Sequence, residues 1–235
     1  DTQLVDLNLD RKVDVLRTLD SGRWQMCFSQ RDTDIDLAPF DNFPGPEDQD
    51  VTADGRLDPL AWQCTGTQVP VGLSADARLQ NPQYRLADLN GDRLQDWLWL
   101  RPAHEGIRVR FYPTQGPGVV DQPVLTDAVL PIFSPNMRDV QVADINGDGR
   151  ADLVFVRPNQ VQVWRHLGGG RWQGPLAFAG ARYDPANTDI RFADINGNGS
   201  VDVVWVHRGL AAMEYLDVQG ATKAHLLAQI DNGLG

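Results

Sequence analysis

The chain has 235 residues, of which 42% are hydrophobic, and a formal net charge of −11 with a pI near 4.6. This acidity argues against nucleic acid and anionic membranes as partners. No apolar run is long enough to span a bilayer, so we expect no membrane insertion by this domain. Only three of the 32 acidic residues are glutamates, which leaves 29 aspartates. Because aspartate favours turns and ligand sites over helices, the composition predicts an all-β chain with many Asp-rich loops.

The first predicted unit has a strand at residues 2–5, an Asp-rich loop at 6–14 and an apolar strand at 15–19. Its loop, DLNLDRKVD, is a variant of a nine-residue pattern, D-x-N-G-D-G-x-x-D, that recurs along the chain. Both glycines of the pattern are replaced in this copy. Residues 31–50, rich in Pro and Asp, read as a long loop on one face of the fold.

The second predicted unit consists of the loop DVTADGRLD at 50–58 and the strand PLAWQC at 59–64. The two cysteines of the chain, Cys27 and Cys64, both lie in apolar, strand-like segments. This setting favours two buried free thiols over a disulfide, although pairing stays open.

Three further units carry the loops DLNGDRLQD, DINGDGRAD and DINGNGSVD, at residues 88–96, 144–152 and 194–202. Each loop follows a short strand, at 84–87, 140–143 and 190–193, and precedes an uninterrupted apolar strand, at 97–102, 153–158 and 203–208. Third strands are predicted at 107–113, 161–167 and 211–218, a fourth at 175–181, and a second long loop at 113–136. Four strands in each unit of roughly 40–50 residues are typical of a β-propeller blade. We therefore predict one domain over residues 1–235, a β-propeller of about five four-stranded blades with Asp-rich loops between first and second strands.

The loops offer oxygen ligands for a hard cation. Side chains at positions 1, 3, 5 and 9 and the carbonyl at position 7 can converge on one Ca²⁺ ion. Alternatively, the same side chains cap backbone amides in a metal-free turn. We expect structural calcium in the 144 and 194 loops, leave the 88 loop open, and favour the metal-free turn at 6 and 50. The predicted ligands are Asp144, Asn146, Asp148, Arg150 and Asp152; Asp194, Asn196, Asn198, Ser200 and Asp202; and Asp88, Asn90, Asp92, Leu94 and Asp96.

The loop pattern and its flanking strands resemble the FG-GAP/VCBS repeat of β-propellers. NQVQVWRHLGGGRWQGPLAF (159–178) and the tail HLLAQIDNGLG (225–235) resemble the propeller of the B subunit of bacterial insecticidal toxin complexes and related Rhs/YD-repeat virulence proteins. The resemblance implies a secreted docking and gating module whose protein partner is a pore-forming toxin subunit. It also implies that residues 225–235 lead toward a following domain of a larger protein.

The sequence shows no catalytic constellation, because its four histidines fall in different repeats, so we expect no enzyme activity. The glycines at 168–170 are interpreted as a hairpin turn and not as a phosphate loop. Trp97, Trp99 and Trp205 are expected in the core between blades. The third-strand tryptophans, Trp24, Trp164 and Trp172, could stack on a sugar, which makes a carbohydrate-binding propeller (a lectin or adhesin) the alternative function.

Overall fold

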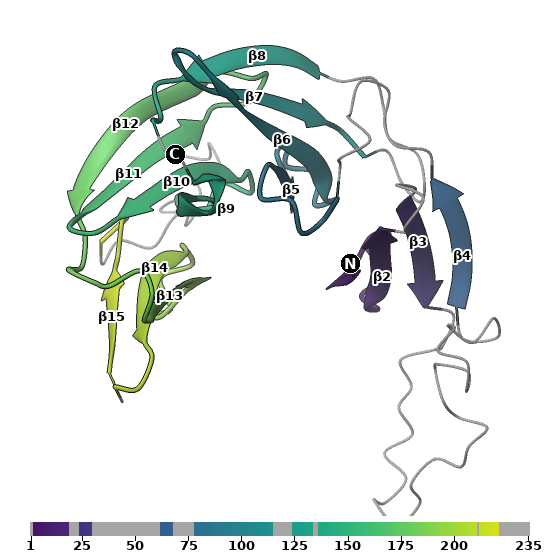
Figure 1. Cartoon of the computed structure of the whole chain (residues 1–235). Helices are drawn as coiled ribbons and strands as arrows, with labels where there is room; N and C mark the ends of the chain where they lie inside the picture. The colour runs from purple at the N-terminus through teal and green to yellow at the C-terminus, as the bar shows by residue number, and fades with distance from the viewer. Residues whose placement is uncertain are drawn as a thin grey trace, which may run out of the picture. The chain divides into compact units, whose positions relative to one another are not determined.

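The chain folds into β-strands joined by loops. The computed structural model describes residues 2–18, 24–29, 62–67, 78–114, 124–133, 136–210 and 212–220. Apart from one 3-10 turn at Met137–Asp139, the regular structure of these residues consists of strands (Figure 1). The described residues contain no helix with the length and hydropathy that a membrane crossing requires. The all-β class predicted from the aspartate-rich composition is confirmed.

Within the described residues, the strands form four sheets in which neighbouring strands follow one another in chain order. Three sheets have four strands and the last has three. The first contains β1 (Thr2–Val5), β2 (Asp14–Thr18), β3 (Trp24–Ser29) and β4 (Trp62–Thr67); the second β5 (Tyr84–Ala87), β6 (Asp96–Ala103), β7 (Gly106–Tyr112) and β8 (Val124–Leu130); the third β9 (Val140–Ala143), β10 (Asp152–Arg157), β11 (Gln160–His166) and β12 (Trp172–Ala179); and the fourth β13 (Thr188–Ala193), β14 (Asp202–His207) and β15 (Met213–Leu216).

The chain divides into two compact units. The first comprises Asp1–Tyr84 and Tyr112–Pro123 and contains the sheet β1–β4. The second comprises Arg85–Phe111 and Val124–Gly235 and contains the other three sheets, apart from one end residue each of β5 and β7.

The sheet β9–β12 has a hydrophobic core on both of its faces. Leu153 and Phe155 of β10 pack in one cluster with Leu98 and Leu100 of β6. The alternate residues of β10 join a second cluster with Val203 and Trp205 of β14. Because successive side chains of a strand point to opposite faces, a strand buried on both sides must be apolar throughout. This explains why the second strand of each sequence repeat, such as β10, is an uninterrupted apolar run.

Two strand predictions were wrong. The segment 59–64 was expected to be the second strand of a separate unit, but residues 62–67 form β4 and pair with β3 at the edge of the first sheet. The segment 113–136 was expected to be a loop, but it contains β8, which pairs with β7. The alternation in both segments is weak, so the sequence does not indicate which strand each would join. The predicted loops at 31–50 and 50–58 lie outside the described residues.

The preference for free thiols was also wrong. Cys27 and Cys64 form a disulfide with a Cα–Cα distance of 4.0 Å. The two residues face each other directly in the antiparallel pairing of β3 with β4. Side chains at opposed positions of neighbouring strands are close enough for a disulfide, but the sequence does not reveal that these two segments are neighbours.

Candidate calcium-binding loops

Each of the four described Asp-rich loops connects the first two strands of a sheet. The loops begin at Asp6, Asp88, Asp144 and Asp194 and lead from β1 to β2, β5 to β6, β9 to β10 and β13 to β14, respectively. In every case the ninth residue of the pattern is the first residue of the second strand. The repeat therefore ends where the buried strand begins.

The four loops share one backbone conformation. Positions 4 and 6 of each loop have positive φ angles, between 63° and 86°, whether or not the residue is glycine. The residues concerned are Leu9, Arg11, Gly91, Arg93, Gly147, Gly149, Gly197 and Gly199. Glycine adopts this left-handed conformation readily, whereas other residues do so at a cost. The 6 loop therefore keeps the turn although it has lost both glycines that favour it, and the 88 loop keeps the turn although Arg93 replaces one of them.

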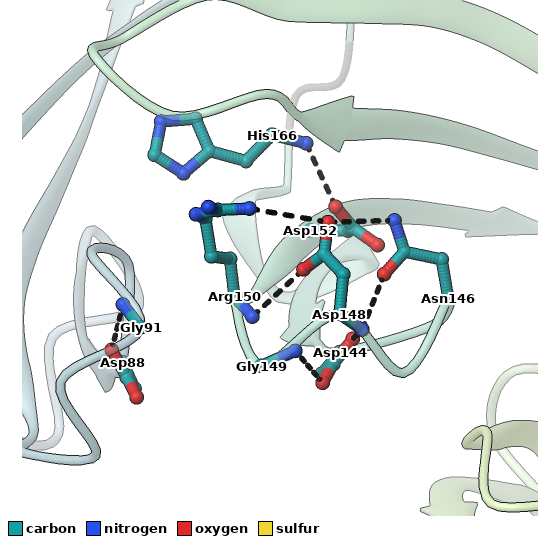
Figure 2. A network of polar contacts seen from close by, with 9 residues as sticks. All are labelled: Asp88, Gly91, Asp144, Asn146, Asp148, Gly149, Arg150, Asp152 and His166. Carbon is teal, nitrogen blue, oxygen red and sulfur yellow. Dashed lines mark hydrogen bonds and ion pairs between the residues drawn. The ribbon is translucent and has the colours of Figure 1, made fainter. Parts of the chain in front are cut away.

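Hydrogen bonds within the 144 loop hold its polar side chains inward (Figure 2). Asp144 accepts from the amides of Asp148 and Gly149, at 3.1 and 2.8 Å. The Asn146 side chain accepts from the Asp148 amide at 2.9 Å and donates to the Asp148 carboxylate at 3.1 Å. Asp148 in turn accepts from the amide of Arg150 at 2.9 Å. These bonds are those expected of a capped turn, and they leave lone pairs on the same oxygens for a cation.

The aspartate at position 9, which begins the second strand, accepts hydrogen bonds from its own loop and from the third strand. Asp14, fully buried, accepts from the amide of Leu7 in its own loop at 2.8 Å and from the amide of Ser29, which ends β3, at 3.0 Å. Asp152 likewise accepts from a third-strand amide, that of His166 at the end of β11, at 2.8 Å. This recurring geometry gives position 9 a structural role that does not require a metal.

Burial makes the negative charge at position 9 unfavourable. Burial raises the pKa of Asp152 to about 7, with a further contribution from the carboxylates of Asp148 and Asp144, against the lowering effect of the His166 amide. Burial likewise raises the pKa of Asp14 and of Asp202. A cation at the loop would remove this cost, because it would neutralise the clustered carboxylates.

Two of these buried carboxylates have an oxygen without a hydrogen bond. They are Oδ2 of Asp152 and Oδ1 of Asp202. A buried acceptor that lacks a partner is costly, and a bound ion would satisfy it. The residues of the 144 and 194 loops therefore fit a hard cation with oxygen ligands.

The closest approach of carboxylates occurs in the loop where the sequence favoured a metal-free turn. Oxygens of Asp6, Asp10 and Asp14 lie within 4.8 Å of one another, and no other described group of three acidic, His or Cys side chains approaches as closely. The replaced glycines were the reason for favouring the metal-free turn in this loop. Its backbone nevertheless adopts the same turn as the other described loops, so the loss of the glycines does not count against an ion here.

The 194 loop recruits a carboxylate from outside the repeat. Asn198 stands where the other described loops have Asp, and its side-chain nitrogen donates to the carbonyl of Gly220 at 2.9 Å. Asp217, which follows β15, accepts from the side chain of Asn196 at 2.7 Å. Sequence reasoning missed Asp217, because it lies beyond the nine-residue pattern and only the β14–β15 hairpin brings it to the loop.

The 88 and 144 loops contact each other. The amide of Ala151 donates to the carbonyl of Asp88 at 2.7 Å. The side chain of Arg150 extends toward Gly91 of the 88 loop, where an added Cβ would lie 3.6 Å from its Cγ (Figure 2). Its guanidinium also lies 3.5 Å from the Asp148 carboxylate. Arg150, predicted to offer only its backbone carbonyl, thus also supplies a side chain that lies against both the 144 loop and the 88 loop.

The third-strand tryptophans do not form an exposed sugar platform. Trp24 and Trp164 are each 1% exposed. Trp172 is half-buried and stacks on His166, with ring centroids 4.6 Å apart. Trp97 and Trp205 are buried as expected, whereas Trp99 is half-buried and lies beneath the guanidinium groups of two arginines. The prediction that Trp24 and Trp164 could stack on a sugar is therefore wrong, because both side chains are buried.

The remaining sequence features are placed as follows. The glycines at 168–170 form the turn between β11 and β12, as predicted, and all three have positive φ. His166 is 1% exposed within the core, and His207 ends β14. His104 occupies the turn between β6 and β7. His225 and the tail at 225–235 lie outside the described residues.

Solved structures similar to this chain include toxin-complex proteins and a lectin. A Tc holotoxin pore from Photorhabdus luminescens is 19% identical over 91% of this chain, with a TM-score of 0.42, and a TcdB2–TccC3 complex without its hypervariable C-terminal region is 18% identical over 91%, with a TM-score of 0.49. A lectin from Agrocybe aegerita, which recognises non-reducing terminal N-acetylglucosamine, is 17% identical over 87%, with a TM-score of 0.53. The chain spans 14% of each toxin chain and 45% of the lectin chain. The lectin likeness indicates a shared fold alone.

No curated protein matches the chain in a sequence search. The family model of the FG-GAP-like repeat matches residues 88–155 and 144–205. The two matches together span residues 88–205, which is half of the chain, and each contains two Asp-rich loops and the strands between them. On this evidence the chain belongs to the FG-GAP-like repeat family.

Proposed function

We propose that this chain is a non-enzymatic protein-docking module of a large secreted bacterial protein of the toxin-complex type. The observation that carries the proposal is the segment 159–178, whose sequence resembles the propeller of toxin B subunits. This segment forms the hairpin β11–β12, and its side chains fill the cores on both faces of the sheet. A rigid stack of sheets, with loops at the strand ends, suits recognition of another protein.

The disulfide supports the secreted part of the proposal. Bridges such as Cys27–Cys64 form and persist in oxidising compartments and are rare in the cytosol. The net charge of −11 favours a partner surface with basic residues, since complementary charge speeds association.

The docking proposal is tested by measuring binding to a pore-forming toxin subunit encoded in the same genome. Biolayer interferometry with the full chain should detect saturable binding that weakens with added salt. A genome that encodes no such subunit, or a purified subunit that the folded chain does not bind, would contradict the proposal.

We also propose that the Asp-rich loops bind calcium as a structural ion. The 144 loop would hold it with Asp144, Asn146, Asp148 and Asp152 and with the carbonyl of Arg150. The orphaned oxygens of Asp152 and Asp202 and the raised pKa of both carboxyls support an ion in the 144 and 194 loops. The close carboxylates of the 6 loop extend the proposal to that site. The ion would neutralise the carboxylates and fix the turn that starts each buried strand.

Removal of calcium should therefore destabilise the chain. We expect a chelator to lower the melting temperature and added calcium to restore it, whereas magnesium restores it less. The Asp144→Asn/Asp148→Asn double variant should respond more weakly, and Asp184→Asn, in an exposed turn outside the repeats, should respond like the unmodified chain. Equal melting temperatures with chelator and with calcium would refute the calcium proposal.

A further inference from the structure

A polar hollow lies between the sheets β9–β12 and β13–β15, at the strand ends opposite the Asp-rich loops. It has a volume of about 350 Å³, and its polar lining is Asn136, Arg138, Asp139, Gln141, Tyr183, Thr188 and Asp189. We refer to these residues as the Tyr183 site. A second hollow of about 410 Å³ shares Tyr183 and Thr188 and extends toward His207. Both volumes fall in the range of small-molecule sites, about 300–1,000 Å³.

Hydrogen bonds fix the residues around the hollow before any ligand binds. Thr188 Oγ1 lies 3.2 Å from Nδ1 of His207, whose Nε2 lies 3.0 Å from a carboxylate oxygen of Glu214. Asp189 is held by the guanidinium of Arg208 through two hydrogen bonds. The side chain of Gln141 donates to the carbonyl of Arg138. A site whose side chains are already ordered loses little conformational entropy on binding.

The lining indicates the class of ligand. It carries the guanidinium of Arg138 and two carboxylates, of which Asp189 is already paired with Arg208, so the charges of the lining balance. An ionic ligand would therefore lose hydration on entering without gaining a net attraction. It also offers two side-chain amides, a hydroxyl and a phenol, which together can donate and accept hydrogen bonds. The ring of Tyr183 and the side chains of Pro185 and Ile190 add apolar surface. Donors and acceptors beside an aromatic face match a sugar ring, whose hydroxyls are polar and whose C–H faces are apolar.

We propose that the Tyr183 site binds a neutral carbohydrate, with the sugar ring against Tyr183 and its hydroxyls bonded to Arg138, Asp139 and Gln141. The pKa of the Tyr183 phenol is raised by burial, with a contribution from Asp139, so the phenol stays protonated and can donate at neutral pH. This site is distinct from the third-strand tryptophans and from the Asp-rich loops. It does not depend on docking to a toxin subunit.

The test is saturation-transfer NMR with the full chain and a panel of glucose, galactose, mannose and N-acetylglucosamine at millimolar concentration. We expect transfer to at least one of these neutral sugars and none to glucuronate, which carries a negative charge. The signal should disappear in Tyr183→Ala and weaken in Gln141→Ala, which removes one polar group and is less disruptive to folding. Tyr215→Ala is the matched control, because Tyr215 is 52% exposed and does not line the hollow.

Several outcomes would overturn the proposal. Absence of transfer to every neutral sugar would do so, as would an undiminished signal in both folded variants of the lining. Transfer to glucuronate in preference to the neutral sugars would show that the ligand class is wrong. Since the interferometry experiment contains no sugar, failure of the carbohydrate site and failure of the docking function are distinguishable.

Discussion

Arg93 occupies a backbone conformation that its side chain disfavours. Its φ of 73° matches that of the glycines at the same position of the 144 and 194 loops. A non-glycine residue in the left-handed region costs of order 1–3 kcal/mol, which glycine avoids at some cost in chain entropy. The strain is tolerated here because Asp88 accepts from the amide of Arg93 at 2.6 Å and Asp92 accepts from the amide of Leu94 at 2.8 Å, so two hydrogen bonds hold the turn.

Arg93→Gly should stabilise the chain. We expect a gain of about 1 kcal/mol in the free energy of unfolding, measured by urea denaturation. The control is Arg108→Gly, at an exposed position of β7 with no positive φ, which should lose about 0.5–1 kcal/mol. Equal losses in the two variants would show that Arg93 is not strained.

Asp152 should make stability depend on pH when calcium is absent. Its folded-state pKa is about 7 and its ordinary value is 3.8, so the folded chain keeps a proton that the unfolded chain loses. Stability is therefore present at low pH and lost as the pH rises from about 4 to about 7. Burial lowers the pKa of His166, which has the opposite effect, since stability is lost as the pH falls through its ordinary pKa of 6.5.

The Asp152→Asn variant separates these two contributions. In chelator, we expect the unmodified chain to lose on the order of 2–4 kcal/mol between pH 4 and 7, moderated by His166. In the variant, the loss of stability over this range should be smaller, because the Asp152 contribution is gone while those of Asp14, Asp202 and His166 remain. Melting temperatures of both proteins across the range would check this, and parallel curves would contradict it.

At the scale of the element, the disulfide joins β3 to β4 across 37 residues of sequence. A cross-link of this span restricts the unfolded chain and contributes about 2–4 kcal/mol to stability. Cys64→Ala should therefore lower the free energy of unfolding by that amount. A reducing agent should produce a similar loss in the unmodified chain and none in the variant. An unchanged denaturation midpoint in both cases would mean that the bridge does not stabilise the sheet.

Strand existence was more predictable than strand partnership. The apolar run at 153–158 and the aspartate that precedes it identify β10 closely, because burial on both faces leaves a continuous pattern. By contrast, nothing in the sequence at 59–64 states that it pairs with β3, and the pairing of Cys27 with Cys64 follows only from that register. Pairing depends on contacts between distant segments, which local pattern does not encode.

The candidate loops were also predictable from a local pattern, but residues that reach a loop from outside the pattern were not. Asp144, Asn146, Asp148 and Asp152 occur together in nine residues, so a short pattern is enough to find them. Asp217 reaches the 194 loop through a hairpin and could not be found in this way. The Tyr183 site, which combines residues from two sheets, had no signal in the sequence.

At the scale of the whole molecule, the sheet β9–β12 is enclosed on both faces within the second unit. Leu153 and Val154 are adjacent in β10, fully buried, and belong to opposite cores. A sheet with one face in water would tolerate replacement of one of the two. A sheet between two others should tolerate neither.

Both substitutions to alanine should therefore destabilise the chain. We expect Leu153→Ala to cost about 2–5 kcal/mol and Val154→Ala about 1–3 kcal/mol, because each removes methyl groups from a packed core. Val206→Ala, at a position that is 38% exposed, should change stability by about 0.5 kcal/mol or less. Denaturant titrations of the three variants check this, and a neutral effect of either core substitution would contradict enclosure on both faces.

The hydrogen bond from the amide of Ala151 to the carbonyl of Asp88 couples the stability of the 144 loop to that of the 88 loop. An ion that tightens the 144 loop also restrains the first residue of the 88 loop, so the second ion would meet a ligand already in place. Thermodynamic linkage makes this assistance reciprocal. These two repeats would then fill cooperatively, and a modest change in ambient calcium would order both loops together rather than one at a time.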